Sequence, residues 1–227
     1  MKCIDSNKLR NVSRLIPALL ASLFLSACAS STKPGVELLP GAETPSTEAR
    51  RVAILQQQQD WSFKSRISIR IEENGSTEGG SGNLRWKQSP QHTELNFHAA
   101  FGRAAWHLIA GPEQAKVTLA DGSVYVDSDV QRLLSRQLGW DVPVSVFSCW
   151  LRGLVVAPEC PAGSAIVVNR DAQGRPLQLR KNEWQVRFHS WSIVDNLSLP
   201  KKIEFSAPGR KFVLVIKQWS LSNNNSN

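Results

Sequence analysis

The side chains that most often carry chemistry are sparse in this chain, beginning with cysteine and histidine. The sequence has four cysteines and four histidines among 227 residues. Cys149 and Cys160 are eleven positions apart, a spacing that permits a disulfide in an oxidising compartment but does not establish one. No CxxC pair occurs and the histidines are scattered, which does not match the ligand spacing of zinc sites. We therefore expect no metal site and no cofactor.

Other residues that resemble catalytic groups have simpler structural explanations. The sequence contains no G-x-S-x-G nucleophile elbow. The glycine-rich stretch 75–82 lacks the lysine and the spacing of phosphate-binding loops, so it is expected to form a flexible hairpin. His98 and His107 fall on the polar faces of predicted strands, while Asp127 and Asp129 flank a helix start, where carboxylates favour the helix dipole. No set of residues supports covalent catalysis, and we expect a protein that is not an enzyme.

Cys28 stands at the end of an N-terminal segment that is typical of an export signal. Four basic residues precede Leu15–Leu25, an apolar run of eleven residues, whereas a membrane span needs about 20. The run ends in Leu25-Ser26-Ala27-Cys28, which resembles the lipobox of bacterial lipoprotein signals. This resemblance implies cleavage before Cys28, acylation of its thiol and, because Ala29 rather than Asp follows, placement in the outer membrane. The alternative is an ordinary cleaved signal in which the cysteine has no role.

The chain divides into four parts by composition. Residues 1–27 form the signal, and residues 28–47 are rich in Ser, Thr, Pro, Gly and Glu, which predicts a flexible tether. Residues 48–222 are predicted to hold a single domain, followed by a disordered polar tail at 223–227. The signal contains four basic residues and one aspartate, so its removal lowers the formal net charge from +8 to +5. A mature charge of this size gives no reason to expect nucleic-acid binding.

The hydrophobic period of the domain changes along the chain. Residues 48–60 have the composition of a helix, and from Trp61 onward apolar and polar residues alternate, which predicts a meander of antiparallel strands. Two segments with helical spacing, 128–139 and 143–153, interrupt the meander. The expected fold class is therefore mainly β with helices (α+β): an open antiparallel half-barrel of about eleven strands, with a three-helix lid over an apolar cavity.

Apolar strand faces and helix faces are the candidate walls of that cavity. The chain has eight tryptophans, which suit broad apolar walls, although a large aromatic core is the simpler explanation. A period of two assigns the strand residues to one face but does not show that this face points inward. The candidate lining residues are Ile67, Ile69, Trp86, Leu95, Phe97, Trp106, Leu108, Leu133, Leu134 and Trp150.

The turn Ala99–Arg103 joins two predicted strands and carries Phe101, although turns usually carry polar residues. One interpretation folds the ring back onto the core. The other makes Phe101 and Gly102 an exposed apolar tip that inserts into a membrane, with Arg103 beside it for lipid headgroups. Burial of one Phe contributes about 1.5–3 kcal/mol, which suits a reversible membrane contact.

Several segments, in order, resemble one known family. They are LSAC at 25–28, NLRWKQ at 83–88, AAFG at 99–102, QRLLSRQLGWDVPV at 131–144, CWLRGL at 149–154, and the C-terminal strand segments WQVRFHSW, LPKKIEF and KQW. The order and spacing resemble the LolB family, outer-membrane receptors of the lipoprotein-sorting pathway. The resemblance implies an open barrel that accepts acylated lipoproteins from the periplasmic carrier LolA and inserts them into the outer membrane. The chain departs from the family pattern at Ala100, often Pro, at Phe101, often Leu, and at Cys149 and Cys160.

The implied partners are a LolA-like periplasmic carrier, the acyl chains of client lipoproteins and outer-membrane lipid, and the protein is expected to act as a monomer facing the periplasm. The competing hypothesis is a structural envelope lipoprotein that scaffolds a membrane complex. A scaffold needs no cavity, so saturable binding of a fluorescent fatty acid distinguishes the two.

Overall fold

The computed structural model describes residues 46–73, 75–101, 104–140, 142–155, 160 and 165–222. The expected signal, Cys28, all but the end of the expected tether, and the expected tail lie outside these residues. None of the helices that are described is long and apolar enough to cross a membrane. Glu43–Asn227 forms one compact unit, and every buried side chain described falls between Arg51 and Trp219. This unit therefore contains its own core, as an independently folding domain requires.

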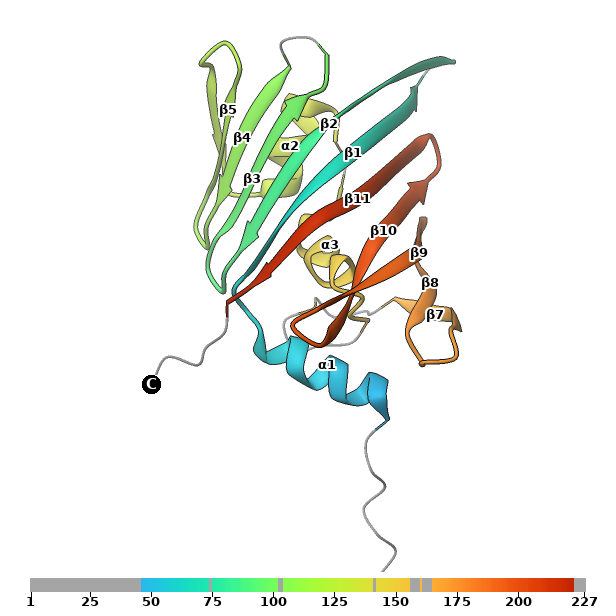
Figure 1. The fold of residues 1–227 in the computed structure, drawn as a ribbon. Coiled ribbons are helices and arrows are strands. Elements are labelled where there is room, and N and C mark those ends of the chain that lie inside the picture. Colours follow the sequence, from blue (N-terminus) through green and yellow to red (C-terminus); the bar gives the residue numbers. More distant parts are fainter. Residues whose placement is uncertain are drawn as a thin grey trace, which may run out of the picture. The chain divides into compact units, whose positions relative to one another are not determined.

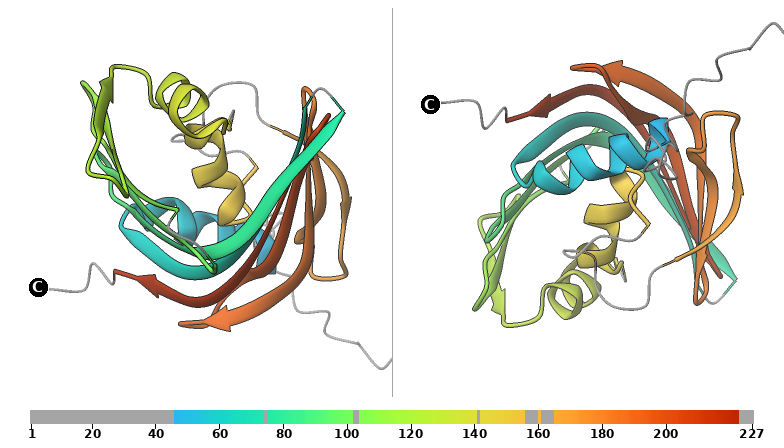
Figure 2. Two further views of the ribbon diagram at one scale, coloured as in Figure 1. Left: turned by 90° about the horizontal axis from the view of Figure 1, so that it is seen from above. Right: turned by 90° about the horizontal axis from the view of Figure 1, so that it is seen from below.

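Eleven antiparallel strands form one continuous sheet, as the alternation predicted. Its order is β6-β5-β4-β3-β2-β1-β11-β10-β9-β8-β7, so the first and last strands pair at the centre and β6 and β7 are the edges. Figures 1 and 2 show that the sheet curves around two helices as an open half-barrel. The strands are β1 (Trp61–Glu73), β2 (Ser76–Gln88), β3 (Thr93–Ala99), β4 (Ala105–Ala110), β5 (Ala115–Leu119), β6 (Val124–Asp127), β7 (Ile166–Arg170), β8 (Pro176–Lys181), β9 (Trp184–Val194), β10 (Leu197–Ala207) and β11 (Arg210–Leu221).

The three helices occupy two different places. Helices α2 (Val130–Leu138) and α3 (Val144–Leu151) lie on the concave side of the sheet, between its two edges (Figure 2). Helix α1 (Thr47–Gln57) crosses the end of the sheet at which β1 begins (Figure 1). We call α2 and α3 the lid helices, because among the described helices these two cover the concave face (Figure 2).

Local capping sets the limits of α2. The carboxylate of Asp129 accepts hydrogen bonds from the backbone N–H groups of Gln131 and Arg132, which have no partner within the helix. The N-cap is therefore Asp129, within the segment 128–139 for which the sequence predicted a helix. Gly139 ends the helix in the left-handed conformation (φ 65°), as expected for a glycine at that position.

Alternation along β1 separates a buried face from an exposed one. Trp61, Phe63, Ile67 and Ile69 are buried, whereas the polar residues between them point to the convex side. Ser65 is the polar member of the buried face, and its hydroxyl donates to the carbonyl of Leu84 at 3.1 Å. A buried hydroxyl that has a partner does not incur the penalty of an unmet hydrogen bond. One face of the strand thus packs against the core along most of its length.

Strand β2 corrects the expectation of a flexible hairpin at 75–82. Gly75, with φ 77°, belongs to the turn, and pairing with β1 begins already at Ser76, opposite Glu73. The pairing then continues through the glycines to Gln88, opposite Trp61. Glycine weakens a strand but keeps its backbone donor and acceptor, and pairing with β1 gives every second residue of the segment partners for both.

The strand order gives the sheet two distinct ends. The turns β1–β2, β3–β4, β5–β6, β8–β9 and β10–β11 lie at one end, which we call the distal rim. Helix α1 and the remaining hairpin turns lie at the opposite end (Figure 1). Phe101 therefore lies at the end of the sheet opposite to the point where the chain enters the domain.

Candidate functional site

The residues that the sequence assigned to cavity walls lie on the concave face of the sheet and on the lid helices that cover it. All of them are buried, with Leu108 at 0% exposure. They fall into three groups by position: Ile67, Trp86, Leu95 and Leu134 line an enclosed pocket; Ile69, Phe97 and Trp106 line an open cleft at the distal rim; Leu108, Leu133 and Trp150 are packed in the core and line neither space.

The enclosed pocket is apolar and very small. Its volume is about 30 Å³, which is roughly the volume that one water molecule occupies in the liquid. Side chains of α3 fill the space, and the Phe147 ring stacks on Phe205 with centroids 4.4 Å apart and meets Trp184 edge-on at 5.1 Å. Phe147 was not among the predicted wall residues, although its spacing to Trp150 and Leu151 on one helix face was a usable signal.

The open cleft at the distal rim is much larger, about 1,110 Å³. It lies between the β1–β2 hairpin, the β3–β4 turn and the residues that follow α2. The rings of Phe97 and Trp106 stack with centroids 5.6 Å apart, and Trp140 meets both edge-on, at 5.7 and 5.0 Å respectively. Trp140 lines the enclosed pocket as well as the cleft, so it separates the two spaces. Sequence reasoning missed Trp140 because the turn after Gly139, rather than a helical period, sets its position.

Phe101 is 92% exposed at the tip of the β3–β4 turn. The turn is held by two backbone hydrogen bonds, from Ala99 N–H to the carbonyl of Ala104 at 2.8 Å and from Ala100 N–H to that of Ser81 at 2.7 Å. This geometry excludes the interpretation in which the ring folds back onto the core. Gly102, the other predicted tip residue, lies outside the described residues.

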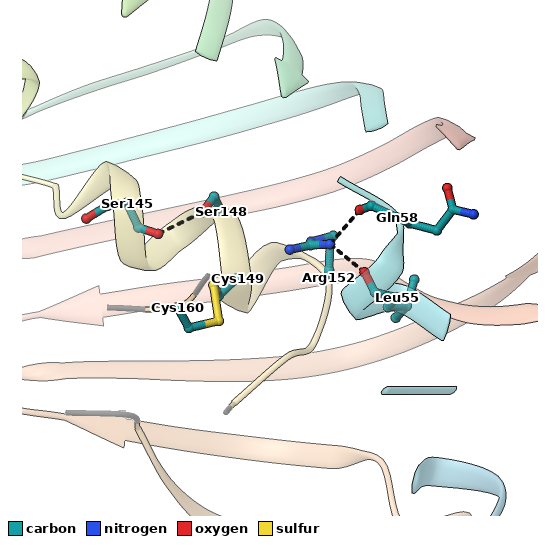
Figure 3. The surroundings of a disulfide bond; sticks show 7 residues. All are labelled: Leu55, Gln58, Ser145, Ser148, Cys149, Arg152 and Cys160. Carbon is teal, nitrogen blue, oxygen red and sulfur yellow. Dashed lines mark hydrogen bonds between the residues drawn. A yellow bond between two sulfur atoms is a disulfide. The ribbon is translucent and has the colours of Figure 1, made fainter. Parts of the chain in front are cut away.

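Two buried arginines connect α1 with the end of α3. The Arg51 guanidinium donates to the carbonyls of Arg152 and Gly153 at 3.0 and 2.9 Å, and is paired with Glu48 at 2.7 Å. The Arg152 guanidinium donates to the carbonyls of Leu55 and Gln58 at 2.8 and 2.9 Å (Figure 3). Local sequence patterns contain no signal for this network, because it joins positions about a hundred residues apart.

Cys149 and Cys160 form a disulfide, with their Cα atoms 5.9 Å apart (Figure 3). The bond connects the last turn of α3 to the chain that follows it, and so answers a question that the spacing alone left open. A cross-link of this kind restricts how far the end of the helix can separate from the next segment.

Asp127 and His107, two residues that had resembled catalytic groups, have structural partners. Hydrogen bonds from the Arg132 guanidinium and from the Asp129 backbone N–H lower the pKa of Asp127. On the convex face, hydrogen bonds from Lys87 and Asn96 lower the pKa of Glu94, which also lies 3.1 Å from the His107 ring. Within the described part of the chain, no three side chains of the metal-ligating types are grouped. The concave face offers apolar surface rather than acid–base chemistry.

Comparisons with known proteins give a consistent family. The family model described as "Outer membrane lipoprotein LolB" matches residues 59–219. A protein named outer-membrane lipoprotein LolB from Alkalilimnicola ehrlichii is 30% identical over 92% of this chain and 98% of its own. A protein of the same name from Xanthomonas oryzae pv. oryzae is 33% identical over 77% and 79%. The solved structure of a LolA superfamily protein from Nitrosomonas europaea, at 14% identity, covers 77% of this chain and 93% of that one with a TM-score of 0.46, too low to add to the assignment.

Proposed function

The chain belongs to the LolB family of outer-membrane lipoproteins, and from this premise we propose that it accepts acylated lipoproteins from a LolA-type carrier and inserts them into the outer membrane. The family match across residues 59–219 is the observation that carries the proposal. The process consists of binding and release, so it requires neither covalent catalysis nor a cofactor. We also propose that one copy acts alone, since each copy has a complete concave face.

The acyl chains of the client determine what the site has to do. Burial of a methylene group is worth about 0.8 kcal/mol, so one chain of about 15 methylenes gains roughly 12 kcal/mol when it leaves water. The rim cleft, with its aromatic wall, supports binding of such a chain. The enclosed pocket of about 30 Å³ is too small for one, and further chains therefore require the lid helices to move away from the sheet.

Attachment is assigned to a residue outside the described part of the chain, and delivery to a residue at the edge of the rim cleft. We propose that acylated Cys28 anchors the domain through the tether 28–47. The exposed Phe101, with Gly102, is proposed to enter the target membrane during delivery. A single ring gains about 1.5–3 kcal/mol on burial, which allows the domain to withdraw after each transfer.

The competing hypothesis of a scaffolding lipoprotein is less favoured, because it accounts for neither the family match nor an open aromatic cleft. A transfer assay separates the two. Vesicles carry the lipidated chain, and a soluble LolA-type carrier presents a fluorescent triacylated lipoprotein. We expect the fluorescent lipoprotein to become vesicle-bound in the presence of the chain and to remain with the carrier on vesicles without it. Equal transfer to both kinds of vesicle contradicts the proposal.

A further inference from the structure

Two glycines of β2 face the concave side, and their surroundings differ. Gly82 lies opposite Ile67 and Gly80 opposite Ile69, so both share the face of these buried residues. A methyl group at Gly82 would collide with the carbonyl oxygen of His98 and come within 2.6 Å of the Phe97 ring. A methyl group at Gly80 would have no atom within 4 Å. The fold therefore requires glycine at position 82 but has no steric need for it at position 80.

The open space above Gly80 is the rim cleft. Gly80 forms part of its floor, with Ile69 on the neighbouring strand and the rings of Phe97, Trp106 and Trp140 around it. A closed apolar cavity of about 150 Å³ holds benzene, which has six carbon atoms. A cleft of about 1,110 Å³, even with part of its volume open to solvent, has room for a long hydrocarbon chain.

Glycine at position 80 also weakens the strand that contains it. A glycine inside a strand loses more conformational entropy on folding than other residues and adds no packing. Its φ angle is not in the left-handed region, which would have given another reason for glycine. A β-branched or larger residue would fit the backbone and favour the strand. The structural consequence of glycine here is the depth of the cleft.

We propose that Gly80 is a specificity-determining residue: its missing side chain keeps the rim cleft deep enough to admit one acyl chain while the lid helices are still in place. This inference rests on the proposed function and adds an entry step to it. The first chain lies along β2 on Gly80 and Ile69, against the ring of Trp106. Trp140 lies between this position and the enclosed pocket, so further entry proceeds past its ring.

The test compares two substitutions that place a leucine on opposite faces of β2, of which only the first adds bulk. Gly80→Leu fills the cleft floor, and Asn83→Leu adds a leucine to the exposed convex face of the same strand. Each is made in residues 28–227 with Cys28→Ser, which retains the complete compact unit. Binding of dansyl-labelled undecanoic acid is followed by fluorescence titration, and thermal unfolding by circular dichroism.

We expect Gly80→Leu to weaken binding about tenfold, as for the loss of roughly two buried methylene groups, without lowering Tm. Gly80→Ala should weaken binding less, and Asn83→Leu should bind as the parent does. Parent-like binding by Gly80→Leu overturns the role of Gly80 and leaves the proposed function intact. A lowered Tm for Gly80→Leu also overturns the role of Gly80, because position 80 then does not face open space. Absence of saturable binding by the parent instead contradicts acyl binding itself.

Discussion

Arg51 and Arg152 each donate hydrogen bonds to the C-terminal carbonyls of the other's helix. Helix C-termini carry unpaired carbonyls and a partial negative charge. A buried guanidinium therefore stabilises them both by hydrogen bonds and by its positive charge. Each guanidinium also lies over a tryptophan, Arg51 at 5.2 Å from the Trp191 centroid and Arg152 at 5.4 Å from that of Trp61. These hydrogen bonds fix the end of the lid helix α3 to α1, the first helix of the described residues.

Loss of the hydrogen bonds donated by one of these two arginines should destabilise the domain. Arg152→Met leaves the buried carbonyl of Leu55 and the part-buried carbonyl of Gln58 without these donors, and we expect the free energy of unfolding to fall by about 2–4 kcal/mol. Urea denaturation followed by tryptophan fluorescence measures the change. Arg136→Met is the control, because that side chain is exposed and should change stability by less than about 0.5 kcal/mol. Equal effects of the two substitutions would contradict the role given to Arg152.

The tip residue should affect delivery without affecting acceptance. Phe101→Glu places a charge on the exposed ring position, and a carboxylate enters hydrocarbon at a cost that prevents insertion. We expect the variant to take fluorescent lipoprotein from the carrier at the parent rate but to transfer it to vesicles at least about tenfold more slowly. Ile193→Glu, also on an exposed apolar side chain but on β9, away from the distal rim, is the matched control. If Ile193→Glu slows delivery to the same extent, the effect does not belong to the tip.

The disulfide should contribute to stability by an amount that rises with the logarithm of the length of the loop that it closes. For a loop of about a dozen residues the expected contribution is about 2–3 kcal/mol, so Cys149→Ser/Cys160→Ser should unfold at a lower temperature than the parent. Thermal unfolding in the presence and absence of dithiothreitol provides the measurement. The reductant should lower Tm of the parent and leave the double variant unchanged. A parent Tm that does not respond to complete reduction, verified by thiol titration, would exclude this contribution.

Acid should loosen the attachment of α2 to the edge of the sheet. The hydrogen bond from Arg132 lowers the pKa of Asp127, so the ionised carboxylate contributes stability above its unfolded pKa of about 4, and this is lost as the pH falls below that value. We expect Tm of the parent to fall between pH 6 and pH 3 by more than Tm of Asp127→Asn. Asp195→Asn, in the β9–β10 turn, should keep the parent's pH dependence. The same acid sensitivity in Asp127→Asn as in the parent would show that this pair does not contribute.

Local patterns predicted much of this fold. A period of two was sufficient to assign Ile67 and Ile69 to the buried face of β1, because a strand with one buried face repeats that pattern in its sequence. Gly139 marked the end of α2, because the left-handed cap position favours glycine strongly. The glycines of 75–82 misled the prediction, since the hydrogen bonds that hold them come from β1, which the local composition does not reflect.

The features that sequence reasoning missed depend on contacts between distant segments. The network of Arg51 and Arg152 joins two helix ends, and the position of Trp140 follows from the turn after α2. The exposure of Phe101 depends on backbone hydrogen bonds within the β3–β4 turn and to Ser81, so the composition of the turn could not decide between an inward and an outward ring. The size of the enclosed pocket could not be predicted from the sequence either, because it depends on how closely Phe147 packs against β10.

Phe101 lies at the rim opposite α1, so the segment before α1 must be long enough for Phe101 to reach the membrane. The β3–β4 turn lies beside Ser68 of β1, which is seven residues along the strand from Trp61. The turn is therefore roughly 23 Å from the end of the sheet at which β1 begins. Residues 29–45 can span at most about 60 Å when fully extended. With Cys28 as the proposed anchor, a segment of this length lets the domain turn over and bring its far end to the membrane that holds Cys28. The length of residues 29–45 then sets the radius within which the domain can reach that membrane surface.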